Sequence, residues 1–121
     1  MGRRVLIVDD SVTMRDMVSY TLANAEFRVL EAENGADALR ILEDNVVDLI
    51  ITDINMPKLN GIELTRKVRC TVNNTFVPIL CLTTETGGDI KADAKTAGAT
   101  GWLQKPFDPD TLVETAKKVC L

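Results

Sequence analysis

The stretch Leu49-Ile50-Ile51-Thr52-Asp53-Ile54-Asn55-Met56-Pro57 decides the fold. Its first four residues predict a strand that is buried on both faces, because a continuous aliphatic run is typical of a parallel sheet. The run ends abruptly on the carboxylate of Asp53. Ligands of parallel sheets bind in the crevice at the carboxyl ends of the strands, so we expect Asp53 to face whatever occupies that crevice.

The rest of the chain alternates between strand patterns and helix patterns. Apolar runs predict strands at residues 4–8, 28–32, 49–53, 77–83 and 101–104, and 3.6-residue periodicity predicts helices near 11–25, 38–45, 61–69, 89–97 and 109–119. This alternation indicates an α/β fold with a parallel sheet that helices cover on both faces. Right-handed crossovers favour an open, doubly wound sheet, but periodicity does not fix the order of its strands.

Several local signals refine these helices. Thr13 and Asp16 resemble a capping box for the first helix, and Asn34-Gly35 predicts a turn. Asn60 predicts the cap of the third helix. The first helix is expected to bury an apolar stripe made of Met14, Met17, Val18 and Leu22.

Composition indicates one domain over residues 1–121. The chain has 121 residues, 45% of them hydrophobic, and can form a single core without metal or disulfide support. A net charge of −4 argues against general affinity for nucleic acid. No apolar run has the length of a membrane span and no signal peptide is evident, so we expect no membrane partner and a cytoplasmic protein. Cys70, Cys81 and Cys120 lack metal-binding spacing and are expected to be reduced thiols.

Three carboxylates follow two of the predicted strands. Asp9 and Asp10 come directly after residues 4–8, and Asp53 ends residues 49–53. If these strands are neighbours, the three negative charges share one crevice and repel one another. Mg²⁺ suits such an all-oxygen site and also takes a phosphate oxygen. We therefore hypothesise that Asp53 is a nucleophile that accepts a phosphoryl group; taken singly, each acid could instead be a turn or cap residue.

Two further side chains follow strands in the same way. Lys105 could pair with Asp53 or with a phosphoryl oxygen as a point charge, although most lysines lie on the surface. Thr83 ends the fourth strand, and its hydroxyl could donate to a phosphoryl oxygen or cap the next helix.

Together, these motifs resemble the response-regulator receiver family. The resemblance covers the whole chain and lies in residues 5–11, 53–57, Gly61, 82–84 and 105–107. It implies a flavodoxin-like (βα)5 fold with strand order 2-1-3-4-5. It also implies that Asp53 is the phosphoacceptor, that Lys105 binds the acyl phosphate and that Thr83 is the switch hydroxyl.

The resemblance extends to the metal. It implies that Asp10, Asp53 and the backbone carbonyl of Asn55 bind Mg²⁺ directly, and that Asp9 acts through water. Asn55 and Glu85 occupy positions that influence the lifetime of the phosphoryl group, and a labile signal is one hypothesis; they could equally be ordinary solvated loop residues.

Partners follow from the same resemblance, most closely to CheY-like chemotaxis receivers without an output domain. The phosphoryl donor would be a phosphohistidine on a CheA-like histidine kinase or a histidine phosphotransferase, in agreement with the absence of histidine here. Output would be binding of a FliM-like flagellar switch protein to the face formed by the fourth helix, the fifth strand and the last helix, with a phosphatase as a further possible partner. Trp102 stands where receivers usually carry Tyr or Phe, so it could switch inward or simply cover the sheet edge or a partner surface.

The same residues suggest three alternative functions. A phosphorelay or phosphate-sink receiver would use the same site without acting on a motor. An aspartate-nucleophile phosphatase needs a second acid where Asn55 stands, so that function is disfavoured, and we expect a signalling switch rather than an enzyme. A flavodoxin-type nucleotide or flavin binder needs a glycine-rich loop where Asp9-Asp10-Ser11 stands.

Overall fold

The computed structural model of the protein describes residues 2–56, 59–71, 74–84 and 88–120, and forms a five-stranded parallel sheet with the order β2-β1-β3-β4-β5. The strands are β1 (Arg4–Val8), β2 (Arg28–Ala32), β3 (Leu49–Asp53), β4 (Ile79–Thr83) and β5 (Gly101–Gln104). The helices are α1 (Val12–Ala23), α2 (Gly35–Asp44), α3 (Gly61–Arg69), α4 (Gly88–Ala97) and α5 (Pro109–Val119). The flavodoxin-like fold and the strand order implied by the resemblance are confirmed.

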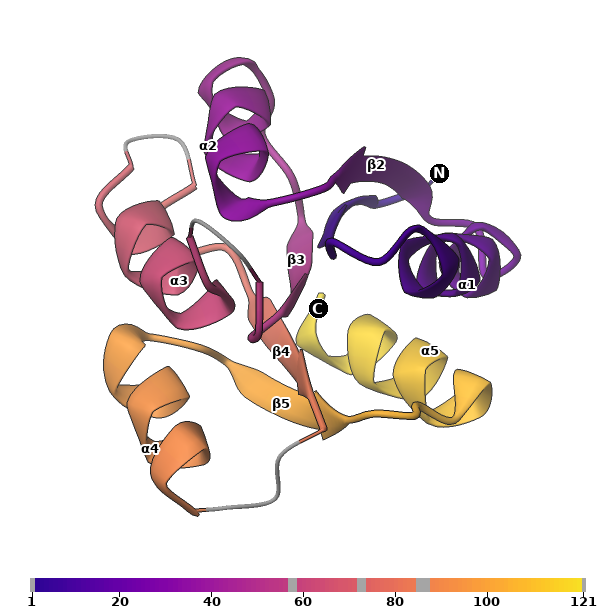
Figure 1. The fold of residues 1–121 in the computed structure, drawn as a ribbon. Helices are drawn as coiled ribbons and strands as arrows, with labels where there is room; N and C mark the ends of the chain where they lie inside the picture. Colours follow the sequence, from indigo (N-terminus) through magenta and orange to yellow (C-terminus); the bar gives the residue numbers. More distant parts are fainter. Residues whose placement is uncertain (1, 57–58, 72–73, 85–87, 121) are drawn as a thin grey trace.

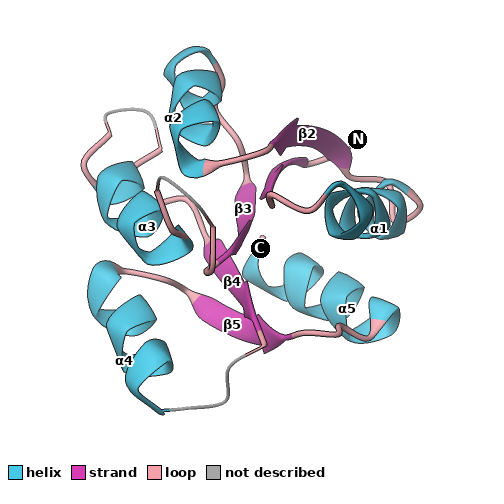
Figure 2. Cartoon of the chain, in the orientation of Figure 1, coloured by secondary structure: helices cyan, strands magenta, loops and turns pink. Residues whose placement is uncertain are grey.

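The helices cover both faces of the sheet. Figure 1 shows α1 and α5 on one side, with α2, α3 and α4 on the other, and Figure 2 shows the strands as a central row between them. Each layer of helices packs on its own apolar cluster. One cluster includes Val18, Leu22 and Leu112 beneath α1 and α5, and the other includes Leu64 and Val68 beneath α3. The sheet therefore separates the two clusters and contributes residues to both.

Burial differs between the centre and the edges of the sheet. Every residue of β3 and β4 is buried, as the unbroken apolar runs predict. In β5, an edge strand, partly buried and exposed residues alternate, so that Trp102 and Gln104 are exposed. The central strands thus hold their carboxyl ends in a fixed frame, whereas β5 presents every second side chain to solvent.

Two predicted helix starts were wrong in detail. The cap of α1 is Ser11, whose hydroxyl accepts a hydrogen bond from the amide of Met14, so Thr13 lies inside the helix rather than at its cap. The predicted turn at Asn34-Gly35 is instead the start of α2, which begins at Gly35 rather than near residue 38. Asn34 caps this helix, its side chain accepting from the amide of Asp37. The Asn60 cap of α3 is confirmed.

The predicted stripe of α1 was only half right. Val18 and Leu22 are fully buried, and Met14 is partly buried. Met17 is 50% exposed, because it lies at the margin of the face that packs on the sheet and looks toward α5 instead.

Arg69, at the end of α3, ties three segments together. Its guanidinium donates to the carbonyls of Thr75 (3.0 Å) and Val77 (2.6 Å), which lead into β4. It also donates to the carbonyl of Gly98, at 2.7 and 3.0 Å, directly after α4. The carboxyl end of α4 is thereby fixed to α3 and to the start of β4.

Three free cysteines are present, as expected: Cys70 is exposed, and Cys81 and Cys120 are buried. Among the described residues, no helix is both long and apolar enough to cross a membrane.

Candidate functional site

The acids predicted to share a crevice do meet at one edge of the sheet. Strands β1 and β3 are neighbours, and Val8 pairs with Thr52, so Asp9 and Asp53 follow side by side. One carboxylate oxygen from each of Asp9, Asp10 and Asp53 lies within 4.8 Å of the others. Asp9 and Asp53 are 1% and 6% exposed, whereas Asp10 faces solvent. The cluster is open on the side of Asp10.

Lys105 reaches this cluster from the end of β5. Its Nζ atom lies 3.1 Å from Oδ1 of Asp53 and 3.3 Å from Oδ2 of Asp9. The backbone amide of Lys105 donates to the carbonyl of Thr83 at 2.8 Å, which carries the β4–β5 ladder to this point. Lys105 is therefore held at the cluster and is not a surface lysine.

The electrostatic state of Asp53 reflects its burial. Burial raises the pKa of the Asp53 carboxyl, since it removes water from the charged form; the hydrogen bond and the positive charge of Lys105 lower this pKa, and the charges of Asp9 and Asp10 raise it. The net direction is upward. One ammonium thus does not offset the burial and the two neighbouring carboxylates.

The backbone around Asp53 depends on a glycine. A Cβ atom placed on Gly61 would lie 2.3 Å from the carbonyl oxygen of Asp53 and 3.0 Å from Cα of Ile54. The amide of Gly61 donates to the carbonyl of Ile54 at 3.0 Å. Only a residue without a side chain lets α3 begin this close to the end of β3.

Four contacts hold Asp9, and none of these partners was predicted from the sequence. Its amide donates to the carbonyl of Ala32 (3.2 Å), and its carbonyl accepts from Nη1 of Arg15 (2.7 Å). Its Oδ1 accepts from the amide of Ser11 (2.9 Å), and its Oδ2 accepts from Lys105. The contact of Arg15 spans six positions and depends on how α1 packs, so no local sequence signal could have revealed it.

The other predicted site residues are placed as follows. Thr83 is 1% exposed at the end of β4, next to β3 in the sheet. Asn55 lies two residues beyond Asp53 and is exposed; binding of the metal by its carbonyl remains a prediction. Trp102 is 39% exposed, with Nζ of Lys91 5.6 Å from the centre of its ring. Glu85 lies outside the described residues.

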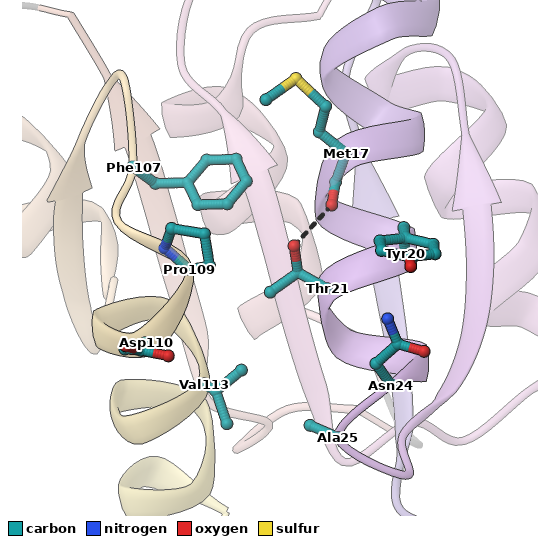
Figure 3. Close-up of a pocket in the computed structure, with 9 residues that line it drawn as sticks. All are labelled: Met17, Tyr20, Thr21, Asn24, Ala25, Phe107, Pro109, Asp110 and Val113. Carbon is teal, nitrogen blue, oxygen red and sulfur yellow. Dashed lines mark hydrogen bonds between the residues drawn. The ribbon is translucent and has the colours of Figure 1, made fainter.

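A groove of about 620 Å³ lies away from the acids, between α1 and α5. Figure 3 shows Met17 and Thr21 of α1 on the side toward Phe107 and Val113, with the hydroxyl of Thr21 donating to the carbonyl of Met17 at 2.8 Å. The lining is mainly apolar and carries no cluster of acids, so this groove is separate from the acidic site.

The donor set at the strand ends suits a hard divalent cation. The carboxylates of Asp9, Asp10 and Asp53 offer only oxygen, which Mg²⁺ prefers. Three carboxylates beside one ammonium leave an excess of two negative charges, which matches the charge of the ion. Burial, and after it the charges of Asp9 and Asp10, raise the pKa of Asp53, and a bound cation would offset both effects, so the residues present fit Mg²⁺.

Comparison with known proteins agrees with the geometry. Residues 5–117 match the response regulator receiver domain family. The chain is 40% identical over 118 residues to the chemotaxis protein CheY1 of Helicobacter pylori, covering 96% of this chain and 95% of that protein. The chemotaxis response regulator CheY4 of Vibrio cholerae has a similar structure, with a TM-score of 0.93 and 45% identity over 98% of this chain and 99% of that one.

A more distant structure bears on the acids. The receiver domain of the sensor histidine kinase PA1611 from Pseudomonas aeruginosa, with a magnesium ion coordinated in its active site cleft, is 28% identical. It aligns with a TM-score of 0.92 over 99% of this chain and 98% of that one. With its strand order, its strand-end acids and these matches, the chain belongs to the response regulator receiver domain family and is CheY-like.

Proposed function

We propose that this chain is a phosphorylation-activated switch of a two-component system that acts in chemotaxis. Asp53 accepts a phosphoryl group in the presence of Mg²⁺, and the modified domain binds a partner through the face formed by α4, β5 and α5. The observation that carries the proposal is the meeting of Asp9, Asp10, Asp53 and Lys105 at one edge of the sheet. The similarity to chemotaxis proteins supports the choice of pathway.

In the transfer step, a carboxylate oxygen of Asp53 attacks the phosphorus of a phosphohistidine. The new P–O bond forms as the P–N bond breaks, and the imidazole leaves, so that Asp53 becomes an aspartyl phosphate. The chain has no histidine, so the donor is another molecule: a CheA-like histidine kinase or a histidine phosphotransferase. Water later hydrolyses the acyl phosphate, and the domain acts on no substrate other than itself.

Each site residue has a role in this step. Asp10, Asp53 and the carbonyl of Asn55 hold Mg²⁺, with Asp9 acting through water. Bound there, the ion offsets charge on the carboxylates and on the transferring phosphoryl group. Lys105, already 3.1 Å from Asp53, holds a phosphoryl oxygen as a fixed positive charge.

The response to phosphorylation runs from Thr83 to the output face. The Thr83 hydroxyl moves toward the phosphoryl group, and Trp102 changes its packing on β5, which alters the surface offered to a FliM-like flagellar switch protein. Asn55 and Glu85 set how quickly water, alone or helped by a phosphatase, removes the group. The chain works as one receiver domain in the cytoplasm.

The test is treatment with acetyl phosphate and Mg²⁺, followed by mass spectrometry that locates the added group. We expect one phosphoryl group on Asp53, none in the presence of EDTA, and none in Asp53→Asn. A phosphoryl group on another residue of the native chain, or full modification without metal, would contradict the proposal.

A second experiment separates the chemotaxis function from phosphorelay. The treated protein and Asp53→Asn are each passed over an immobilised flagellar switch protein and an immobilised histidine phosphotransferase. Tighter binding of the treated protein to the switch protein supports action on a motor. Phosphoryl exchange with the phosphotransferase, without any gain in binding to the switch protein, would assign the chain to a phosphorelay or phosphate sink.

A further inference from the structure

Arg15 joins the acidic edge of the sheet to β2. From the second turn of α1, its Nη1 atom donates to the carbonyl of Asp9 at 2.7 Å, and its Nε atom donates to Oε1 of Glu31 at 3.2 Å. The Arg15 side chain is 15% exposed, and that of Glu31 is 41% exposed. One guanidinium therefore ties together the end of β1, helix α1 and strand β2.

The carbonyl of Asp9 has few other ways to be satisfied. The amide of Asp9 forms the last contact of β1 with β2, to the carbonyl of Ala32. Beyond it the chain turns through Asp10 to the α1 cap at Ser11, so it no longer runs beside β2. A carbonyl on a residue that is 1% exposed is costly to leave without a donor, and Arg15 supplies that donor.

The hydrogen bond from Arg15 to the carbonyl of Asp9 also affects the orientation of Asp10. The carbonyl of Asp9 and the amide of Asp10 share one planar peptide group, so holding the carbonyl fixes the plane from which Asp10 departs. Asp10 is the exposed member of the acidic cluster. Glu31 in turn fixes the guanidinium, because Glu31 lies in β2 with its backbone in register with Ile7.

We propose that Arg15, anchored by Glu31, is a positioning residue for the divalent-cation site, setting the orientation of Asp9 and Asp10 without touching the ion. This inference rests on the proposed Mg²⁺ dependence. Side chains that hydrogen-bond to metal ligands without touching the metal orient those ligands. Their loss weakens metal binding about 10-fold to 100-fold.

The sign of the effect separates positioning from simple electrostatics. Arg15 carries a positive charge close to the acids, so removing it would strengthen their attraction for a divalent cation if charge alone mattered. Positioning gives the opposite result, since acids without a fixed orientation hold the ion less well. The direction of the change in Mg²⁺ affinity therefore decides between the two.

The experiment is calorimetric titration of the full chain with MgCl₂, without any phosphoryl donor. For Arg15→Ala we expect a Kd about 10-fold higher than in the native chain, and for Arg15→Lys, which keeps the charge but loses the two-pronged geometry, an increase of about 3-fold. The matched control is Arg40→Ala. Arg40 lines a surface hollow together with Arg15 and Glu31, is exposed, and pairs within α2 with Asp37, so its removal should change the Kd by less than about 2-fold.

Urea unfolding in EDTA accompanies the titrations. An Arg15→Ala protein that is less stable but binds Mg²⁺ as well as the native chain, or better, would make Arg15 a structural tether and overturn the inference. If Arg15→Ala does not fold, Arg15→Lys decides, and an unchanged Kd in it overturns the inference. A native chain that does not bind Mg²⁺ would remove the metal from the proposed function as well, so the two failures are distinguishable.

Discussion

Nζ of Lys105 lies 3.1 Å from Oδ1 of Asp53, although the two residues belong to different strands, with β4 between them. Lys105 also contacts Asp9 on β1, so one ammonium reaches carboxylates from two neighbouring strands. In the proposed transfer, an incoming phosphoryl group would therefore meet a positive charge that is already beside Asp53. Such prior placement is the main source of electrostatic stabilisation in group transfer.

Replacing Asp53 by Asn should stabilise the metal-free protein at neutral pH. The pKa of Asp53 is raised in the folded state, so the folded chain holds this proton more tightly than the unfolded chain. Protonation of Asp53 therefore adds to the free energy of unfolding. This contribution is complete below the pKa of the unfolded chain and is lost as pH rises through the pKa of the folded chain, so that at pH 7 the charged Asp53 carboxylate destabilises the fold. Asp53→Asn removes this destabilisation, and urea unfolding in EDTA should show a higher midpoint than the native chain at pH 7, with the gap closing in acid. An equal or lower midpoint at pH 7 would contradict the electrostatic account.

Gly61→Ala should destabilise the fold and disturb the phosphoacceptor. Its new Cβ would lie 2.3 Å from the Asp53 carbonyl oxygen, so the start of α3 must shift, at about 1–3 kcal/mol. Gly101→Ala is the matched control, because its Cβ would meet Leu80 at an ordinary 3.5 Å. The midpoint of urea unfolding and the rate of modification by acetyl phosphate should both be lower in Gly61→Ala than in the native chain, and unchanged in Gly101→Ala. Equal behaviour of the two variants would show that the close approach is unimportant.

Arg69→Met should also be strongly destabilising, by about 3 kcal/mol, since it leaves the carbonyls of Thr75, Val77 and Gly98 without their donor. Arg66→Met, one turn earlier on the exposed side of α3, is the control and should change the unfolding free energy by less than about 0.5 kcal/mol. Chemical denaturation measures both. Similar values for the two variants would remove the anchoring role.

The cysteines should differ in reactivity. A thiol reagent at pH 7 should label the exposed Cys70 in the native protein, whereas Cys81 and Cys120 should react only after unfolding.

Burial raises the pKa of Cys81 to about 11, so the folded state keeps a proton that the unfolded chain releases from pH 9.0 upward. Stability should therefore fall with rising alkalinity by up to about 1.4 kcal/mol per pH unit from this group. In Cys81→Ala the slope between pH 9 and pH 10 should be smaller; an identical slope would contradict the assignment.

Trp102, the single tryptophan, should report the switch. A fluoride-based phosphoryl mimic with Mg²⁺ should change its emission, and a shift to shorter wavelength would indicate that the ring turns inward. The ammonium of Lys91 over the ring favours the outward position by about 0.5–1 kcal/mol, so Lys91→Met should enlarge the shift. Lys95→Met, exposed on the same helix, should behave like the native chain. Unchanged emission in a fully modified protein would contradict inward switching and leave Trp102 as a cover for the sheet edge or for a partner surface.

The strands and the acids that follow them were readable from the sequence for one physical reason. A parallel strand that is buried on both faces leaves an unbroken apolar run, as in β3, and the point where the run stops marks the edge where ligands bind. Asp9 and Asp53 each stand at such a point, so their meeting followed once β1 and β3 were neighbours. Lys105 follows the edge strand β5 and reaches both acids from beyond β4. The order of the strands did not follow from periodicity; the family resemblance implied it.

What the sequence could not reveal depends on tertiary packing. The cap of α1 is Ser11 rather than Thr13, since the Ser11 side chain accepts from the amide of Met14; serine is a favoured cap residue, so this signal was present in the sequence. The exposure of Met17 depends on where α5 lies, and the contact of Arg15 with Asp9 depends on how α1 crosses β1. The exposure of Met17 and the contact of Arg15 have no period or spacing that a sequence pattern could display.

Because exposure alternates along β5, its outward positions are under a different evolutionary constraint from the residues of the acidic edge. Trp102 and Gln104 point away from the core, whereas the neighbouring β4 has no exposed position at all. If β5 belongs to the partner-binding face, as proposed, substitutions at these two outward sites would alter which protein is recognised while the acidic edge keeps its geometry. A duplicated copy of the chain could thus acquire a new partner protein without any change in its acidic site.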